Sequence, residues 1–356
     1  MTTQGIDYKQ AVDLPDALRA GGRLASIDVM RAVASMLVVA FHLTPEADIT
    51  GPFSAGIDIF FFITGFLMVH ITDRRKPGFW TFMRARAIRV VPLYWLATLT
   101  LILVWWLRSE PLPHLDDVVL SLLFIFHANS HSGISLPVLG AGWTTNYLMF
   151  FYLLFGITLS LGRAAQLAVL SGILISLAAL RPFVDEGNAF ATRMTSPILL
   201  EFLLGSFAAA ALRRFRQREF LSVLHSPLAC FSIMVSAIVL QILASQYLIG
   251  MPRVVIVGLP AAIFLIGAMG LEAVFASRPC AVMRLLGNAS FSLYLFHLHV
   301  ILLFGSIAAD LAEDLFRVLA FATAVLVSLL IYLGIEKPAG SGLRILSRRC
   351  WGQATA

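Results

Sequence analysis

The sequence predicts an all-α polytopic membrane protein with about ten transmembrane helices and both chain ends in the cytoplasm. Of its 356 residues, 59% are hydrophobic and only 13% are charged, whereas soluble domains carry about 25% charged residues. Apolar runs recur from residue 28 to about residue 335, and each is long enough to cross a hydrocarbon core about 30 Å thick. Basic residues gather in alternate segments between these runs, as membrane orientation requires.

The ten apolar runs are the expected spans, taken in order along the chain. They cover residues 28–46, 54–72, 90–107, 143–161, 165–181, 196–212, 226–248, 254–275, 287–306 and 317–335. A further apolar piece at 117–127 is too short to span and is expected to be re-entrant or interfacial. The expected organisation is an N-terminal cytoplasmic tail (1–25), one transmembrane domain (26–338) and a C-terminal cytoplasmic tail (339–356).

The distribution of Lys and Arg orients the chain. One set of segments holds 20 of the 26 Lys and Arg residues, the opposite set holds 5, and Arg31 lies inside a span. The positive-inside rule puts the richer side in the cytoplasm, and an even number of spans then puts both termini there. No basic face is interleaved with aromatic residues on a polar segment, so nucleic acid is not an expected partner.

The first span, IDVMRAVASMLVVAFHL, carries polar residues where a membrane helix has few. Asp28, Arg31, Ser35 and His42 are spaced so that they fall on one helical face. Ionisable residues in a span are costly and usually face a bundle interior or a wet cavity. Asp28 and Arg31 could instead form a simple helix-end ion pair, and His42, about 21 Å further along the axis than Asp28, could be an interfacial residue.

The second span begins AGIDIFFFITGFL and returns across the membrane, which puts Asp58 at a depth similar to that of His42. A carboxylate that accepts a hydrogen bond from one imidazole N–H orients the ring and raises its basicity. We therefore expect His42 and Asp58 to form a base and its orienter. The alternative is that Asp58 only caps the outer end of its helix. Gly56, Thr64 and Gly65 are expected to serve close helix packing.

The densest basic stretch, RRKPGFWTFMRARAIRVVPLYW, is expected to be a loop between the second and third spans. Within it Arg86 and Arg89 stand three residues apart and can share a helical face, and Arg84 lies close by. Arginines near a membrane surface suit phosphate groups, through bidentate hydrogen bonds. Membrane lipids with anionic headgroups would be bound as readily, so spacing alone does not choose between a lipid and a nucleotide.

Two further ionisable residues lie inside spans and are candidate functional residues: Glu201 in SPILLEFLLGS and His297 in NASFSLYLFHLHV. His299 follows His297 by two residues and points roughly 200° away on a helix, so the two histidines are not expected to form a metal pair. No metal site is expected.

Five motifs resemble the acyltransferase family 3 membrane proteins when taken in order: ASIDVMRAVASMLVVAFHL, AGIDIFFFITGFLM, FMRARAIRVVPLYW, LLGNASFSLYLFH and IEKP. GWTTNYLMFFYLLF and PILLEFLLG look most like the branch that O-acetylates exopolysaccharides and similar glycans. The resemblance covers residues 26–338. Each motif alone is weakly specific, whereas five in this order and spacing are specific.

The resemblance implies a bacterial inner-membrane enzyme that moves an acyl group, often acetyl, from cytoplasmic acyl-CoA to a sugar hydroxyl. Acetyl-CoA is then the expected donor. The family's first-helix Arg and His correspond to Arg31 and His42, and its R-x-x-R motif corresponds to Arg86 and Arg89, which are thought to contact CoA. A sugar hydroxyl is a poor nucleophile, so a general base must take its proton, and His42 is the candidate.

The acceptor implied by the resemblance is a cell-surface glycan, carried on a lipid-linked precursor and supplied by the polysaccharide biosynthesis machinery. Trp143, Glu201 and His297 are the candidate acceptor-binding residues. One departure stands in the stretch after Trp143, where this branch usually carries a glutamate and this chain has Leu148. A carboxylate at this position could bind the acceptor or assist the base. Three explanations for its absence are open: Glu201 or Asp58 supplies the carboxylate instead, the acceptor is a different one, or the activity is reduced.

Two other interpretations stay open. Intramembrane Asp, His and Glu residues are also typical of proton relays, and hence of a transporter or flippase for a lipid-linked glycan. Transporters often show two similar halves, however, and no such internal repeat is visible here. The missing acid at Leu148 would also fit a catalytically silent member of the family that binds a partner.

Overall fold

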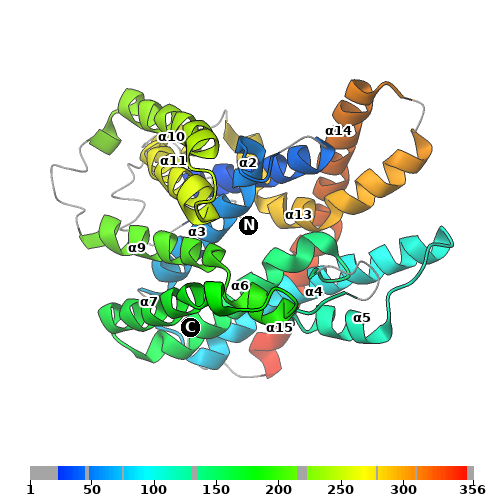
Figure 1. The fold of residues 1–356 in the computed structure, drawn as a ribbon, viewed down its shortest axis with the longest axis horizontal. Coiled ribbons are helices and arrows are strands. Elements are labelled where there is room, and N and C mark those ends of the chain that lie inside the picture. Colours follow the sequence, from blue (N-terminus) through cyan, green and yellow to red (C-terminus); the bar gives the residue numbers. More distant parts are fainter. Residues whose placement is uncertain are drawn as a thin grey trace, which may run out of the picture.

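The computed structural model describes residues 23–44, 48–73, 76–129, 135–214, 223–277, 280–308 and 311–350, with side chains up to residue 345. Every regular element in these ranges is helical (Figure 1). The α-helices are α2 (Ala25–Leu43), α3 (Ala55–Thr72), α4 (Phe79–Leu107), α5 (Leu115–Leu122), α6 (Trp143–Ile157), α7 (Arg163–Ala179), α8 (Ala189–Met194), α9 (Leu200–Arg214), α10 (Pro227–Tyr247), α11 (Leu259–Gly270), α12 (Glu272–Ala276), α13 (Ala281–Ile307), α14 (Glu313–Ile331) and α15 (Lys337–Cys350). Two π-helical turns, Val254–Gly258 and Tyr332–Glu336, lead into α11 and join α14 to α15.

Eight helical stretches in the described ranges are long and apolar enough to cross a membrane. They are Ala25–Leu43, Pro52–Thr72, Phe79–Leu107, Arg163–Phe183, Ala189–Arg214, Pro227–Tyr247, Ala281–Ile307 and Glu313–Ile345. The other two expected spans, 143–161 and 254–275, correspond to the shorter α6 and to the apolar helix Val254–Gly270. The all-helical class is confirmed, while the count of ten and the cytoplasmic termini stay predictions.

The central helices are α2 and α3, with α10 and α11 on one side, α13 and α14 on another, and α4 to α7 across the remaining face (Figure 1). The most extensive packing joins α2 to α13 and α3 to α9, and α10 packs along α11. The helices that carry His42, Asp58, Glu201 and His297 are therefore each packed along a helical partner.

Glycines set the closest helix contacts. A Cβ added to Gly205 would lie 1.9 Å from the carbonyl oxygen of Phe62, and one added to Gly65 would lie 2.0 Å from that of Phe202. One added to Gly56 would lie 2.5 Å from a carbonyl oxygen of α2. Only glycine lets two helix backbones approach this closely, so the predicted packing role of Gly56 and Gly65 is confirmed.

The start of α2 is capped by a residue far along the chain. The carboxylate of Glu272 accepts hydrogen bonds from the backbone N–H of Ala25 (2.6 Å) and of Ser26 (2.8 Å). These are free N–H groups of the first helical turn, where a negative charge is favourable. Beside them, a Cβ added to Gly287 of α13 would lie 1.8 Å from the carbonyl oxygen of Asp28.

Two expected boundaries are wrong or displaced. The basic stretch before the third span is not a loop, because α4 begins at Phe79 and runs through Pro92 to Leu107, so the arginines belong to the helix itself. The last helix continues through a π-helical turn into α15 and passes residue 338 without a break. The division into tails and a transmembrane domain stays a prediction, and residues 1–22 and 351–356 of those tails lie outside the described ranges.

Candidate active site

A cavity of about 720 Å³ lies between α2, α3, α4, α6, α13 and the joint of α14 with α15. It follows α3 from Ile71 to Ile57, a length of about 21 Å along that helix. Its charged lining consists of Arg23, Asp28, Arg31, Arg86, Arg89, Glu336, Lys337 and Arg344. Six cations face two carboxylates, so the cavity is an anion-attracting site.

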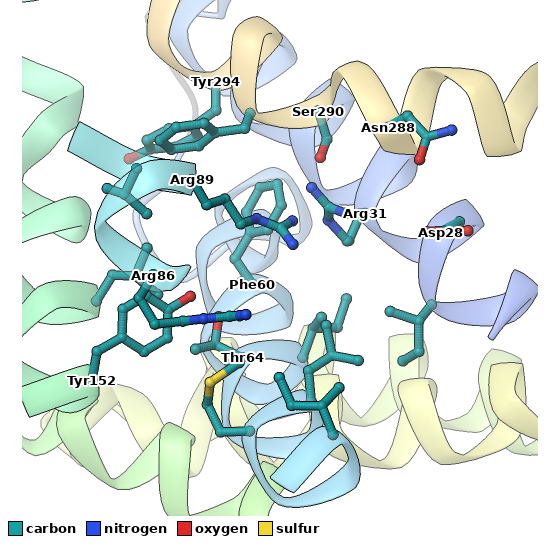
Figure 2. A pocket seen from close by; sticks show the side chains of 18 of the residues that line it. Asp28, Arg31, Phe60, Thr64, Arg86, Arg89, Tyr152, Asn288, Ser290 and Tyr294 are labelled. Carbon is teal, nitrogen blue, oxygen red and sulfur yellow. The ribbon is translucent and has the colours of Figure 1, made fainter. Parts of the chain in front are cut away.

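Three arginines point into this cavity from two helices. Figure 2 shows Arg31 on α2 and Arg86 and Arg89 on α4 directed into one space. Within the described ranges none of the three forms an ion pair, and Arg86 has a side-chain hydrogen bond with the hydroxyl of Tyr152. The guanidinium of Arg86 lies over the rings of Phe82 (5.7 Å) and Tyr152 (5.9 Å), and its Nε is buried without a partner. A buried polar atom without a partner is costly, so the arrangement suits an anionic ligand.

The optional ion pair between Asp28 and Arg31 is not formed. Asp28 instead pairs with Arg23, which precedes α2. Arg31 faces Arg89 across the cavity, and Glu336 attracts both guanidinium groups electrostatically. The Glu336 carboxylate itself accepts a hydrogen bond of 2.6 Å from the hydroxyl of Ser292.

Hydroxyl groups line the cavity at the end near Ile57. Tyr294 on α13 donates to the carbonyl oxygen of Ala141 (2.5 Å), and its oxygen lies 2.6 Å from the hydroxyl of Thr144 on α6. Leu148 also lines this cavity, so the position at which a glutamate was expected presents an apolar side chain there. The cavity is therefore basic at the α15 end and largely uncharged at the Tyr294 end.

A pair of histidines lies just beyond Tyr294 and does not line the cavity. Nδ1 of His42 is 3.3 Å from Nε2 of His297, and the ring centroids are 4.8 Å apart. His297 is fully buried, while His42 is exposed near the end of α2. His299 instead faces α4, where its Nε2 lies 2.8 Å from the carbonyl oxygen of Ala97. The expectation that His297 and His299 point apart is confirmed.

The expected pairing of His42 with Asp58 is not made. Gly56 is the residue of α3 that touches α2, and Asp58, two residues on, points roughly 200° away. Its carboxylate oxygen Oδ2 lies 2.5 Å from Nη2 of Arg253. The same guanidinium donates to the carbonyl oxygens of Ile49 and of Ser54 (2.9 Å), in the segment between α2 and α3.

Glu201 belongs to the same buried group as Asp58 and does not line the cavity. It is 1% exposed, and its carboxyl group lies against that of Asp58. No N–H group or hydroxyl of the described residues donates to either oxygen of Glu201 or to Oδ1 of Asp58. Asp58, Glu201 and Arg253 thus form a buried polar group where α3 and α9 meet the turn that leads into α11.

Two more expected site residues lie outside the cavity. Trp143 packs edge-on against Phe61 and Tyr147, with the guanidinium of Arg193 over its ring at 5.6 Å. Arg84, two residues from Arg86 on α4, is absent from the cavity lining. Among the candidate residues, the structure brings Arg31, Arg86 and Arg89 together around the cavity and places His42 beside His297.

Thr64, which was expected to serve helix packing, lines the cavity. Sequence reasoning missed several other polar residues of the cavity wall: Thr144, Tyr152, Asn288, Ser290 and Tyr294. Figure 2 shows Asn288 and Ser290 on the Arg31 side of the space, and Tyr152 and Thr64 near Arg86. The stretch LLGNASFSLYLFH held a signal for three of them, because polar residues recur there within an apolar run.

Comparisons with known proteins agree with the resemblance seen in the sequence. The acyltransferase 3 family model, described as an acyltransferase domain, matches residues 24–333. A relative from Rhizobium meliloti (strain 1021), the exopolysaccharide production protein ExoZ, is 32% identical over 290 residues, which cover 80% of this chain and 89% of the relative. No solved structure matches the chain. The family model covers most of the chain, and the described residues include eight helices that are long and apolar enough to cross a membrane. The chain therefore belongs to the acyltransferase 3 family and is a multi-pass membrane acyltransferase.

Proposed function

We propose that this enzyme transfers an acetyl or another short acyl group from cytoplasmic acyl-CoA to a hydroxyl of an exopolysaccharide sugar on a lipid-linked precursor. The proposed location is the bacterial inner membrane. The relative ExoZ, named as an exopolysaccharide production protein, supports the acceptor class. The excess of Lys and Arg on one side of the predicted topology supports a donor that enters from the cytoplasm.

The observation that carries the proposal is the trio of unpaired arginines in one cavity. No carboxylate of the described residues forms an ion pair with Arg31, Arg86 or Arg89, although Glu336 is near enough to attract Arg31 and Arg89. Guanidinium groups bind phosphate oxygens through paired hydrogen bonds. The basic end of the cavity therefore suits the phosphates of CoA, and the less polar end near Tyr294 suits the pantetheine arm and its thioester.

The proposed base lies beyond the cavity, at the other end of α2. His42 follows Arg31 by 11 residues, about 16 Å along the helix. A donor whose phosphates sit at the arginines must extend along α2 and past Tyr294 to bring its thioester to this histidine. The proposal thus requires a path between Tyr294 and the histidine pair when the donor is bound.

The proposed reaction needs one proton carrier. The imidazole of His42 takes the proton of the sugar hydroxyl as the hydroxyl oxygen attacks the thioester carbonyl. A carbon–oxygen bond forms, and the negative charge moves to the carbonyl oxygen. When this intermediate collapses, the carbon–sulfur bond breaks, and the proton held by His42 neutralises the departing thiolate. The products are the O-acyl sugar and free CoA thiol, and the base returns to its neutral form.

The first test measures the O-acetyl content of the surface polysaccharide by mass spectrometry. A deletion strain is complemented with the wild-type chain, with His42→Ala, with Arg86→Ala, or with the control Arg108→Gln, at equal membrane expression. Arg108 ends α4 outside the cavity and pairs with Glu110. We expect the wild type and the control to restore acetylation and the two other variants to fail.

Two results would contradict the proposal. Full acetylation with His42→Ala would show that the histidine is not the base. A deletion that changes the export of polysaccharide without changing its acetylation would instead favour the transporter or flippase interpretation. Titration of the purified protein with acetyl-CoA, in wild type and in Arg86→Ala, separates loss of donor binding from loss of chemistry.

A further inference from the structure

The hydrogen bonds of His297 identify which of its ring nitrogens carries the proton. Nδ1 of His297 lies 2.7 Å from the carbonyl oxygen of Tyr294 and 3.2 Å from that of Leu293. Carbonyl oxygens only accept hydrogen bonds, so Nδ1 must be the donor. The ring is fully buried, and no carboxylate contacts it in the described ranges, so a charged form would be costly. A neutral ring with its proton on Nδ1 has a lone pair on Nε2.

The same reasoning applies to His42. Its Nδ1 lies 2.8 Å from the carbonyl oxygen of Val38 and 3.3 Å from Nε2 of His297. Both neighbours are acceptors, so Nδ1 of His42 carries a proton that the two acceptors share. In the neutral ring the lone pair is then on Nε2, which has no partner among the residues described. That nitrogen is free to accept a proton from outside the protein.

We propose that His297 is a positioning residue, which holds His42 in the form that presents the Nε2 lone pair to the acceptor hydroxyl. His297 acts through its own Nε2, as a second acceptor beside the Val38 carbonyl. It has a further effect once His42 has taken a proton, because a hydrogen bond to a charged donor is stronger than one to a neutral donor. The inference rests on the proposed function only in naming His42 as the base.

The direct test is nitrogen NMR of the full-length protein in detergent micelles with ¹⁵N-labelled histidine. The signals of His42 are assigned from the spectrum of His42→Gln. We expect the His42 Nδ1 to appear as a protonated nitrogen and its Nε2 as an unprotonated one. The opposite assignment in the wild-type protein would overturn the inference, whatever the variants do.

Kinetics test the role in the reaction. His297→Phe removes the acceptor, whereas His297→Gln places an amide oxygen within reach of His42. We expect His297→Phe to lower kcat about 10- to 100-fold, the effect of losing one hydrogen bond to a charged group, with the KM for acyl-CoA unchanged. His297→Gln should recover most of kcat.

A matched control comes from the same helix. His299 is also a buried histidine bonded to a main-chain carbonyl, but it faces α4, so His299→Phe should leave kcat near wild type. Equal loss of kcat in His297→Phe and His297→Gln, with both folded, would overturn the positioning role. If His42→Ala keeps full activity while the NMR assignment is as expected, the proposed function fails and the hydrogen-bond assignment stands.

Discussion

Replacing Asp58 with asparagine and Arg253 with glutamine, singly and together, should destabilise the protein rather than remove its chemical step. The Asp58 side chain is 0% exposed, that of Arg253 is 24% exposed, and their closest atoms are 2.5 Å apart. The structure thus gives Asp58 a role in holding α3 to the segment between α2 and α3. The sequence spacing had suggested a role in orienting His42.

The size of the effect follows from the burial of the pair. Removing one partner of a fully buried ion pair costs about 3–5 kcal/mol. Arg253 is partly exposed, which weakens the interaction through solvent screening, and it keeps its bonds to the carbonyls of Ile49 and Ser54. We therefore expect each single variant to lose about 1.5–3 kcal/mol of unfolding free energy, with a coupling energy of about 1–2 kcal/mol between them.

The assay combines unfolding of the purified protein in detergent with acyl-transfer kinetics at a temperature at which all variants are folded. Asp48→Asn is the control, because Asp48 is an exposed carboxylate in the same segment, bonded to Thr50. Loss of a general base or its orienter lowers a rate about a hundredfold or more. If Asp58→Asn lost that much kcat with normal stability, and Arg253→Gln did not, the reasoning from the ion pair would be refuted.

Three other changes test the cavity, the helix contact and the cap. Arg86→Gln should raise the KM for acyl-CoA about 10- to 100-fold, whereas Arg84→Gln should leave it unchanged. An equal rise in KM in both variants would show that the donor does not bind in the cavity. Gly205→Ala should cost about 1–3 kcal/mol of unfolding free energy by forcing α3 and α9 apart, while Gly162→Ala, where an added Cβ meets nothing within 4 Å, should be tolerated. A stable Gly205→Ala variant would contradict the contact. Glu272→Ala should cost about 1–3 kcal/mol in thermal unfolding by leaving N–H groups of α2 unpaired, and an unchanged midpoint would rule out the cap.

The positions of the helices could be predicted well because the bilayer sets the length of each apolar run. The span expected at 226–248 is the helix Pro227–Tyr247. The start of α4 was missed by eleven residues, since Arg84, Arg86 and Arg89 lower the apolar character of its first turns. Hydropathy measures the transfer of a residue into lipid, whereas Arg86 and Arg89 face a cavity inside the protein.

The candidate site was predicted only in part, because spacing gives a residue's depth in the membrane but not the direction in which it faces. Arg31, Arg86 and Arg89 were chosen from local spacing and do share one cavity. Asp58 was expected to pair with His42 because the two residues lie at a similar depth in the membrane. The contact of Gly56 with α2 turns the Asp58 side chain away from that helix.

The remaining site contacts depend on which helices are neighbours. His297 contacts His42 because α13 packs along α2. A single sequence does not show which helices pack against each other. The same holds for Tyr294, whose partners Ala141 and Thr144 lie on or next to α6. Residues of this kind become visible only when the bundle is assembled.

The cap on α2 has a consequence for biosynthesis. Glu272 follows Ala25 by 247 residues, and α13, the main packing partner of α2, comes later still. At a translation rate of about 5–20 residues per second, the first helix waits roughly 12–50 s for its cap to be made. During that interval Asp28 and Arg31 reside in a helix that lacks its main packing partner. Because α3 also packs against α2 and is made directly after it, we expect early association of these two helices to shield the charges until the second half of the chain is made.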